Sequence, residues 1–200
     1  MRRATRWLFG AAILVAAAGL PALAGKYNKA LDVGAPAPQF SGLEAVDGKT
    51  YGLSDFAEKD AVVVVFTCNH CPVAQAYNER FNEFVADYKD KPVGFLAINV
   101  DKGESLDAMK KFAKEEDLDY PYAYDETQKS GKSYGASVTP HVFVLNKDRK
   151  IAYMGAWDDS PMNPDKVEKN YARDAVEAIL AGRTPEVAET QQVGCGIRYE

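Results

Sequence analysis

An apolar, β-branched run that ends abruptly in two cysteines is the feature of this sequence that most limits its fold. Residues 61–67 read AVVVVFT, without alternation of apolar and polar positions, which is typical of a strand buried on both faces of a sheet. Residues 68–72 (CNHCP) end the run, and apolar residues then recur at helical spacing over residues 72–88. The pattern predicts a buried strand, a Cys-x-x-Cys turn and a helix that carries the cysteines at its N-terminus.

This placement determines the chemistry expected of Cys68. A thiol at a helix N-terminus faces unpaired backbone N–H groups and the positive end of the helix dipole, and both favour the thiolate. His70 lies between the cysteines and can add positive charge or donate a hydrogen bond to the sulfur. We therefore expect a lowered pKa for Cys68, with Cys71 one turn away and able to resolve a mixed disulfide.

The rest of the chain alternates predicted strands and helices. Before the central strand, Asp47 and Gly48 indicate a hairpin turn. Behind the first helix we expect a strand at 93–100, a helix at 105–116 capped by Ser105, an extended piece at 120–122 and a helix at 128–134 ended by Gly135. From residue 138 the pattern becomes an antiparallel hairpin, with strands at 141–145 and 150–154, and a last helix at 165–180 with Asp165 as a possible N-cap. A parallel half followed by an antiparallel half indicates an α/β fold.

The first 24 residues differ from the rest. They begin with three arginines, continue with an apolar run at 7–20 and end in Ala-Leu-Ala, which is typical of a cleavable secretory signal peptide. The run is short for a membrane span, and the alternative, an uncleaved signal, would be the chain's contact with the membrane. We expect residues 25–200 to form one exported domain, periplasmic or otherwise extracytoplasmic, where disulfides persist.

The charge of this exported part argues against nucleic acid as a partner. The chain has 24 basic and 29 acidic residues, and removing the three signal arginines leaves 21 basic residues and a net charge of −8. An acidic protein without a basic stripe is repelled by polyanions. We also assign no cofactor.

Several ordered segments resemble the thioredoxin-like superfamily. The resemblance covers about residues 32–182 and is closest, within the redoxin group, to the peroxiredoxin-like thioredoxin family proteins of bacteria. The matching segments are VGAPAPQF at 33–40 with DGK at 47–49, TCNHCP at 67–72, TP at 139–140, GAWDDS at 155–160 and GCGIR at 194–198. The resemblance implies a thioredoxin-like three-layer fold, with a central mixed β-sheet flanked by helices.

The same resemblance implies roles for individual residues. Cys68 is expected to be the exposed nucleophile and Cys71 the buried resolving thiol, while His70 matches a histidine of strongly oxidising relatives. Pro140 is expected to be a cis-proline that faces the sulfurs, and Thr139 to offer its backbone to a substrate strand. These roles imply exchange with protein thiols and disulfides, or with a membrane-bound redox partner.

This chain departs from two related families at positions that matter for their function, which limits the residue roles that the resemblance implies. Thioredoxins bury a carboxylate six residues before the first cysteine, a position that is Val62 in this chain. Peroxiredoxins hold peroxide with a P-x-x-x-[ST]-x-x-C motif, and its first two defined positions are Ala61 and Val65 here.

The sequence therefore predicts an exported thiol-disulfide oxidoreductase, with two alternatives. One is a thiol peroxidase, in which Cys68 becomes a sulfenic acid. The other is a copper- or zinc-binding module formed by Cys68, His70 and Cys71, with His141 as a further ligand, although adjacent ligands aim poorly at one ion. We therefore assign no metal site.

The role of Cys195 stays open, and two aspartates nearer the middle of the chain are expected to have a structural role. Cys195 could fold back to exchange with Cys68, pair between chains or stay buried and inert; Gly194 and Gly196 favour the first reading because they allow close backbone approach. Asp158 and Asp159 are expected to form a solvated turn rather than a paired carboxylate site.

Overall fold

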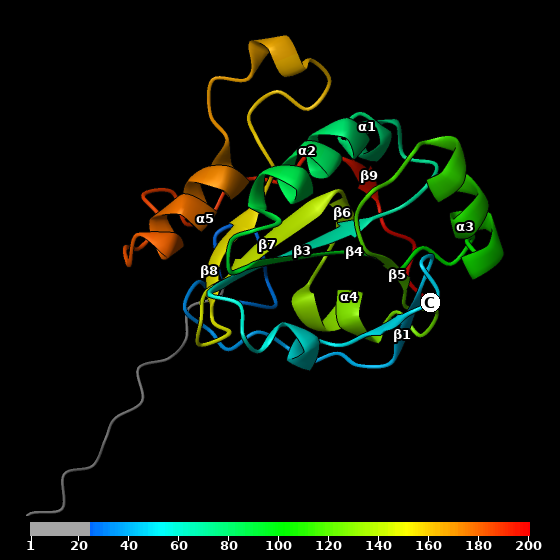
Figure 1. Ribbon diagram of the computed structural model, residues 1–200, viewed down its shortest axis with the longest axis horizontal. Helices are drawn as coiled ribbons and strands as arrows, with labels where there is room; N and C mark the ends of the chain where they lie inside the picture. The colour runs from blue at the N-terminus through cyan, green and yellow to red at the C-terminus, as the bar shows by residue number, and fades with distance from the viewer. Residues whose placement is uncertain (1–24) are drawn as a thin grey trace, which may run out of the picture.

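A seven-stranded mixed sheet forms the centre of the molecule (Figure 1). The structure is a computed structural model that describes residues 25–200, so the predicted signal segment lies outside the described residues. The strand order is β2-β1-β5-β4-β3-β7-β8. The strands of this sheet are β1 (Leu43–Ala45), β2 (Thr50–Tyr51), β3 (Ala61–Thr67), β4 (Val93–Asn99), β5 (Tyr122–Tyr124), β7 (His141–Leu145) and β8 (Ile151–Gly155).

Helices cover both faces of the sheet and complete the three layers. The helices are α1 (Pro72–Gln75), α2 (Asn78–Tyr88), α3 (Leu106–Glu115), α4 (Lys129–Tyr134) and α5 (Tyr171–Leu180), with short 3-10 turns η1 (Leu53–Phe56) and η2 (Pro164–Lys166). α2, α3 and α5 pack on one face, and α4 and η1 on the other (Figure 1). None of the helices in residues 25–200 is long and apolar enough to cross a membrane.

The central strand β3 confirms the main prediction from the sequence. All of its residues are buried, and it pairs in parallel with β4 and antiparallel with β7. Val63 and Val65 join the core beneath α2 and α5, while the alternate residues 62, 64 and 66 join the core beneath α4. Because both faces are buried, the strand has no polar alternation. The mixed sheet and its flanking helices confirm the predicted thioredoxin-like fold.

Several local signals are also confirmed. Ser105 caps α3 by accepting a hydrogen bond from the backbone N–H of Ala108 at 3.2 Å. Gly135 ends α4 in the left-handed region, with φ of 62°. Gly48 has φ of 78° in the turn that joins β1 and β2. The extended piece predicted at 120–122 is displaced, because β5 begins at Tyr122.

The continuous helix predicted over residues 72–88 is wrong, because the chain breaks between α1 and α2. At the break the backbone N–H of Tyr77 bonds to the Ala74 carbonyl in a tighter turn. The Tyr77 hydroxyl donates to the buried carboxylate of Asp158 at 2.8 Å, and Arg80 donates to the freed carbonyl of Ala76 at 3.0 Å. Bonds to a distant segment therefore override the local helical pattern.

The helix predicted over residues 165–180 is also wrong over its first six residues, 165–170. α5 begins only at Tyr171, and Asp165 lies within η2, which Asn163 caps instead. Residues 158–170 project from the body of the molecule beside α2 and α5 (Figure 1). The Asp159 carboxylate accepts backbone hydrogen bonds from residues 168 and 169, which stabilises the projecting segment in a non-helical form.

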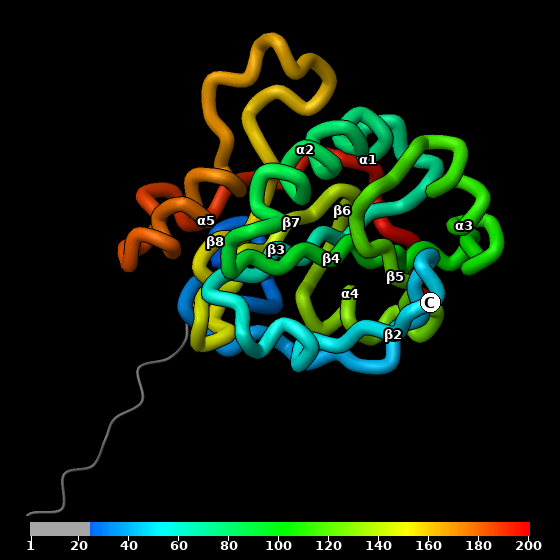
Figure 2. Tube along the Cα trace, viewed as in Figure 1, coloured from blue at the N-terminus to red at the C-terminus, as the bar shows by residue number. Residues whose placement is uncertain are grey.

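The last residues of the chain return to the centre of the molecule. Residues 188–190 run along β8, and the next residues reach β9 (Cys195–Gly196), which pairs antiparallel with β6 (Val138–Thr139). Figure 2 shows this end of the chain passing close to β6 and α1. The end of the chain is thus an integral part of the fold and lies next to the predicted cysteine turn.

Candidate redox site

The two cysteines of the turn lie where the sequence predicts them, between β3 and α1. Cys71 is the residue before the helix, with an extended backbone, and Pro72 opens the helix. The Gln75 side chain donates to the Asn69 carbonyl at 2.6 Å and closes the turn. Proline suits the first helical position because its missing N–H would have no partner there.

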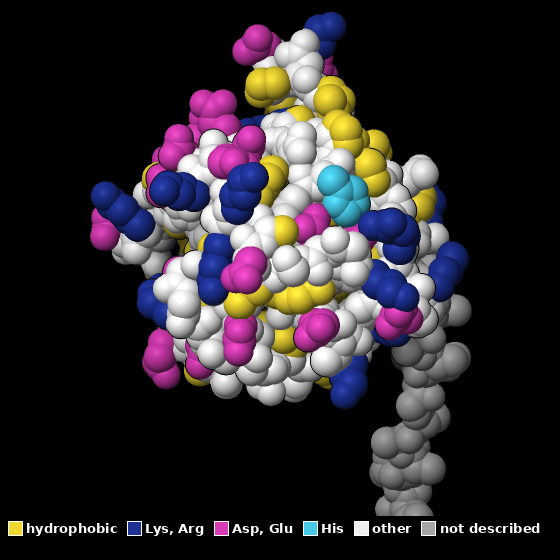
Figure 3. Space-filling view, turned by 90° about the vertical axis from the view of Figure 1, so that its right-hand side faces the viewer, with side chains coloured by type: hydrophobic (Ala, Val, Ile, Leu, Met, Phe, Trp, Pro, Cys, Tyr) yellow, Lys and Arg dark blue, Asp and Glu magenta, His cyan; other side chains and the backbone are white. Residues whose placement is uncertain are grey.

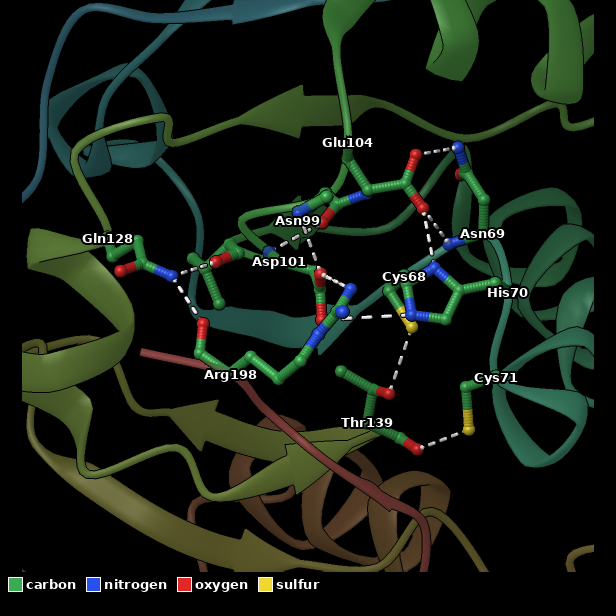
Figure 4. A network of polar contacts seen from close by, with 12 residues as sticks. Cys68, Asn69, His70, Cys71, Asn99, Asp101, Glu104, Gln128, Thr139 and Arg198 are labelled. Atoms are coloured by element: carbon green, nitrogen blue, oxygen red, sulfur yellow. Dashed lines mark hydrogen bonds and ion pairs between the residues drawn. The ribbon is translucent and has the colours of Figure 1, made fainter. Parts of the chain in front are cut away.

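Thr139 contacts both sulfurs. Its hydroxyl lies 3.2 Å from Cys68 Sγ, and its carbonyl accepts a hydrogen bond from Cys71 Sγ at 3.0 Å (Figure 4). The Thr139–Pro140 peptide bond is cis. The structure therefore brings together Cys68, Cys71, Thr139 and Pro140. Both cysteines are buried, with Cys68 at 4% exposed and Cys71 at 0%, so the expected exposure of Cys68 is wrong.

The expected acidity of Cys68 is wrong for this arrangement. Burial raises the pKa of the Cys68 thiol above its ordinary value, although the Thr139 hydroxyl and the backbone N–H groups of Cys71 and His70 act in the opposite direction. α1 is a single turn and offers only a weak dipole. Desolvation therefore exceeds the stabilisation of the thiolate by these donors.

The raised pKa predicts slow alkylation of Cys68 in the reduced protein. Because only the thiolate reacts, a raised pKa shifts the inflection of the pH–rate profile above the ordinary thiol value of 9.0. We expect iodoacetamide to modify Cys68 at pH 7 at least about tenfold more slowly than glutathione, because burial also limits access. Timed alkylation with tandem mass spectrometry measures this rate, and an inflection below pH 7 would contradict the prediction.

Cys195 is the third thiol of the site. It packs against the cluster formed by Cys68, Cys71 and Ala74. Burial acts to raise the pKa of Cys71, but hydrogen bonds from the Cys195 thiol, the Ala74 backbone and Thr139 hold this pKa below its ordinary value. The same contact with Cys71 raises the pKa of Cys195 to about 11. Cys195 therefore lies beside the sulfur that is expected to resolve the mixed disulfide and lowers the pKa of that thiol.

The ring of His70 contacts carboxylates rather than a sulfur. Its Nδ1 lies 2.9 Å from Glu104 Oε1 and its Nε2 lies 3.7 Å from Asp101 Oδ2 (Figure 4). Glu104 also accepts hydrogen bonds from the side chain and the backbone of Asn69. The ring therefore contacts these carboxylates and not, as expected, Cys68, while the backbone N–H of His70 faces the sulfur.

Asp101 joins the turn to the end of the chain. Its carboxylate accepts from Arg198 at 2.7 Å and from the backbone N–H of Gly103 at 3.0 Å. Burial acts to raise the pKa of Asp101, but the Arg198 hydrogen bond and the Gly103 amide hold it below its ordinary value. Gln128 binds the carbonyls of Val100 and Arg198 and so ties the same two segments together.

This carboxylate network is not among the features predicted from the sequence. Asp101 and Glu104 follow β4, the parallel neighbour of β3, so their loop lies at the same edge of the sheet as the cysteine turn. Functional groups gather at the carboxyl ends of parallel strands, and this rule points to both residues. Arg198 lies in the terminal GCGIR segment, but the sequence carries no signal that pairs it with Asp101.

His141 lies in a different environment. It is buried against Phe143, with ring centroids 4.5 Å apart, and burial lowers its pKa to about 4. Phe143 belongs to the core beneath α4, whereas the cysteines form their own cluster. This placement does not support His141 as a ligand beside Cys68. Residues 25–200 contain no group of three histidine, cysteine or acidic side chains arranged to hold a metal ion.

Comparisons with known proteins found a matching family model and several similar chains. The family model described as Redoxin matches residues 32–172. The curated thiol-disulfide oxidoreductase ResA of Bacillus thuringiensis is 31% identical over 141 residues, which cover 70% of this chain and 79% of the relative. An uncharacterised conserved protein of Geobacillus kaustophilus matches with a TM-score of 0.78 and 35% identity, over 91% of this chain and 98% of that one. A hypothetical protein of Sinorhizobium meliloti also has a TM-score of 0.78, at 28% identity over 86% of this chain and 97% of that one.

Proposed function

The chain belongs to the redoxin family, and on that premise we propose that it is an exported thiol-disulfide oxidoreductase whose working pair is Cys68 and Cys71. Its relationship to proteins named thiol-disulfide oxidoreductase makes it an oxidoreductase. The observation that supports the proposed pair is the position of both sulfurs against Thr139, between a buried strand and the start of a helix.

The exchange proceeds in two balanced steps. The Cys68 thiolate attacks one sulfur of a substrate disulfide, which forms a mixed disulfide and releases one substrate thiol. Cys71 then attacks Cys68 Sγ, which forms the Cys68–Cys71 disulfide and releases the second substrate thiol. The substrate is reduced by two electrons and the protein is oxidised by two. The reverse sequence donates the disulfide to a substrate dithiol.

The surroundings of each sulfur suit its step. The Thr139 hydroxyl and the backbone N–H groups of His70 and Cys71 converge on Cys68 and can donate hydrogen bonds that stabilise the thiolate once the thiol ionises. Cys71, with its lowered pKa, is ready to attack the mixed disulfide. Val62 is fully buried where thioredoxins hold a carboxylate, so Cys195, which packs against the cysteine cluster, is the titratable group that lies beside Cys71.

The surface near the turn fits a protein substrate. His70 is exposed, and hydrophobic side chains extend from its neighbourhood towards the projecting segment 158–170 (Figure 3). Met162 in that segment is 62% exposed, and Arg80 binds the carbonyls of Ser160 and Pro161, which places the segment beside the α1–α2 junction. We propose protein thiols and disulfides, or a membrane-bound redox partner, as the substrates.

The export proposal rests on the composition of residues 1–24 and has its own test. Expression of the full chain in a bacterium with two membranes should yield a periplasmic protein that begins at Gly25. N-terminal sequencing of the periplasmic fraction measures this. Recovery of uncleaved protein from the cytoplasm would contradict it.

The reduction potential of the Cys68–Cys71 pair tests the proposed chemistry. The protein is equilibrated in glutathione buffers and its free thiols are trapped, with Cys195→Ser in parallel. A potential above about −150 mV would make the protein a disulfide donor, and one below about −230 mV a reductant. The absence of any dithiol couple would overturn the proposal. Rapid consumption of hydrogen peroxide that is lost in Cys68→Ser would assign a thiol peroxidase instead.

A further inference from the structure

The backbone beside the sulfurs is already paired with the chain's own tail. Cys195 stands opposite Thr139 in the antiparallel pair of β6 and β9, and Gly196 stands opposite Val138. The next residue, Ile197, donates its backbone N–H to the Ser137 carbonyl at 3.0 Å. The tail thus occupies the edge of β6 as an added strand, the place where a substrate strand is expected.

The sequence of the tail permits this close approach at one position in particular. A Cβ atom added at Gly194 would lie 2.0 Å from the Thr139 carbonyl oxygen, so a larger residue would push the strand away from β6. A Cβ atom at Gly196 meets no atom within 4 Å. The docked position of Cys195 therefore depends on one glycine and not on its neighbour.

The tail is anchored on both sides of Cys195. Before it, the backbone N–H of Thr190 bonds to the Met154 carbonyl at 3.1 Å. After it, Arg198 pairs with the buried Asp101 at 2.7 Å, and the Tyr199 hydroxyl donates to the Ala136 carbonyl at 2.8 Å. Two anchors hold the intervening thiol against the sulfur cluster.

We propose that Cys195 is a third catalytic thiol, which attacks Cys71 in the Cys68–Cys71 disulfide and takes the disulfide over. This inference rests on the proposed function of the Cys68–Cys71 pair. The Cys195 thiol gives up its proton and its sulfur bonds to Cys71 Sγ. The bond between Cys68 and Cys71 breaks, and Cys68 leaves as a thiolate that takes up the proton. No outside oxidant is needed.

Cys71, rather than Cys68, is the target because of the contacts in the cluster. Cys195 packs against the sulfur cluster, and Cys71 is the neighbour that affects the pKa of Cys195 most, whereas Cys68 is held against the Thr139 hydroxyl. The transfer also changes exposure, because Cys195 is only half-buried while the other two cysteines are buried. The disulfide therefore moves from a covered pair towards the surface, and Cys68 becomes free again.

The Cys68→Ser variant isolates the proposed disulfide. In glutathione buffers it should form an intramolecular Cys71–Cys195 disulfide, identified by non-reducing peptide mass mapping of the monomer. Adding Gly194→Ala should lower the equilibrium constant for this disulfide by about tenfold or more, because the thiol is no longer held in place. Gly196→Ala, the matched control, should change it by less than about twofold, since its Cβ enters open space.

Two results would overturn the inference. One is the lack of a Cys71–Cys195 disulfide in Cys68→Ser at potentials where the wild-type protein is oxidised. The other is an equal effect of Gly194→Ala and Gly196→Ala, with thermal unfolding used to confirm that both variants are folded. Cys195→Ser separates the two proposals, because a Cys68–Cys71 disulfide formed in that variant supports the proposed function whatever happens to Cys195.

Discussion

Replacing Cys68 by serine should lower the rate of disulfide exchange by at least about a thousandfold, because a serine hydroxyl does not ionise to a nucleophile at neutral pH. The serine still fits beside the Thr139 hydroxyl, so the fold is retained. The rate is measured as reduction of a fluorescently labelled glutathione disulfide, with dithiothreitol to recycle the protein.

Cys71→Ser is the matched variant for this prediction. It keeps the first attack by Cys68 but lacks the resolving thiol, so a mixed disulfide between Cys68 and glutathione should accumulate and be visible by mass spectrometry. Cys68→Ser should form no such adduct at residue 68. If Cys68→Ser reacts at the wild-type rate, Cys68 is not the nucleophile and the proposed mechanism fails.

Replacing Asp158 by alanine should destabilise the protein by about 3–5 kcal/mol, because it breaks a buried ion pair and leaves one charge unpaired. The Asp158 side chain is fully buried and accepts from Arg80 at 2.6 Å and from Tyr77 at 2.8 Å. The Arg80 side chain, which would lose this partner, is only 11% exposed, and its guanidinium carbon lies 3.8 Å from the centre of the Tyr77 ring. Urea denaturation followed by circular dichroism measures the free energy of unfolding.

Asp165→Ala is the control for this change. Asp165 lies in the same projecting segment, but it is exposed, and a surface substitution of this kind usually changes stability by less than about 0.5 kcal/mol. A large loss in both variants would indicate that the projecting segment, rather than the buried ion pair, carries the stability. A small loss in Asp158→Ala would show that Arg80 finds another partner.

The parts of the fold that could be predicted from the sequence depend on local or strand-long patterns. The unbroken apolar run of residues 61–67 identified β3 because burial on both faces removes alternation. Ser105 and Gly135 marked helix ends through capping and left-handed conformations that depend on a few adjacent residues. The cysteine turn could be predicted because the apolar strand pattern ends, and the helical pattern begins, at the two cysteines.

The features that were missed depend on contacts between distant segments. Asp158 lies in a stretch with turn composition, and its burial follows from Tyr77 and Arg80, which lie about 80 residues earlier. The same contacts end α1 at Gln75, which no local signal marks. The raised pKa of Cys68 likewise reflects burial rather than the helix start, and burial cannot be seen in the turn itself.

The site contains an odd number of cysteines, whereas each disulfide uses two of them. One internal disulfide uses two cysteines, so every oxidised chain keeps one thiol, and the identity of that thiol reports the state of the site. A free Cys195 marks the freshly oxidised pair, a free Cys68 marks the disulfide passed to the tail, and a free Cys71 marks direct exchange between the other two. A single alkylating label, located by mass spectrometry, would therefore show which of the three disulfides each molecule carries.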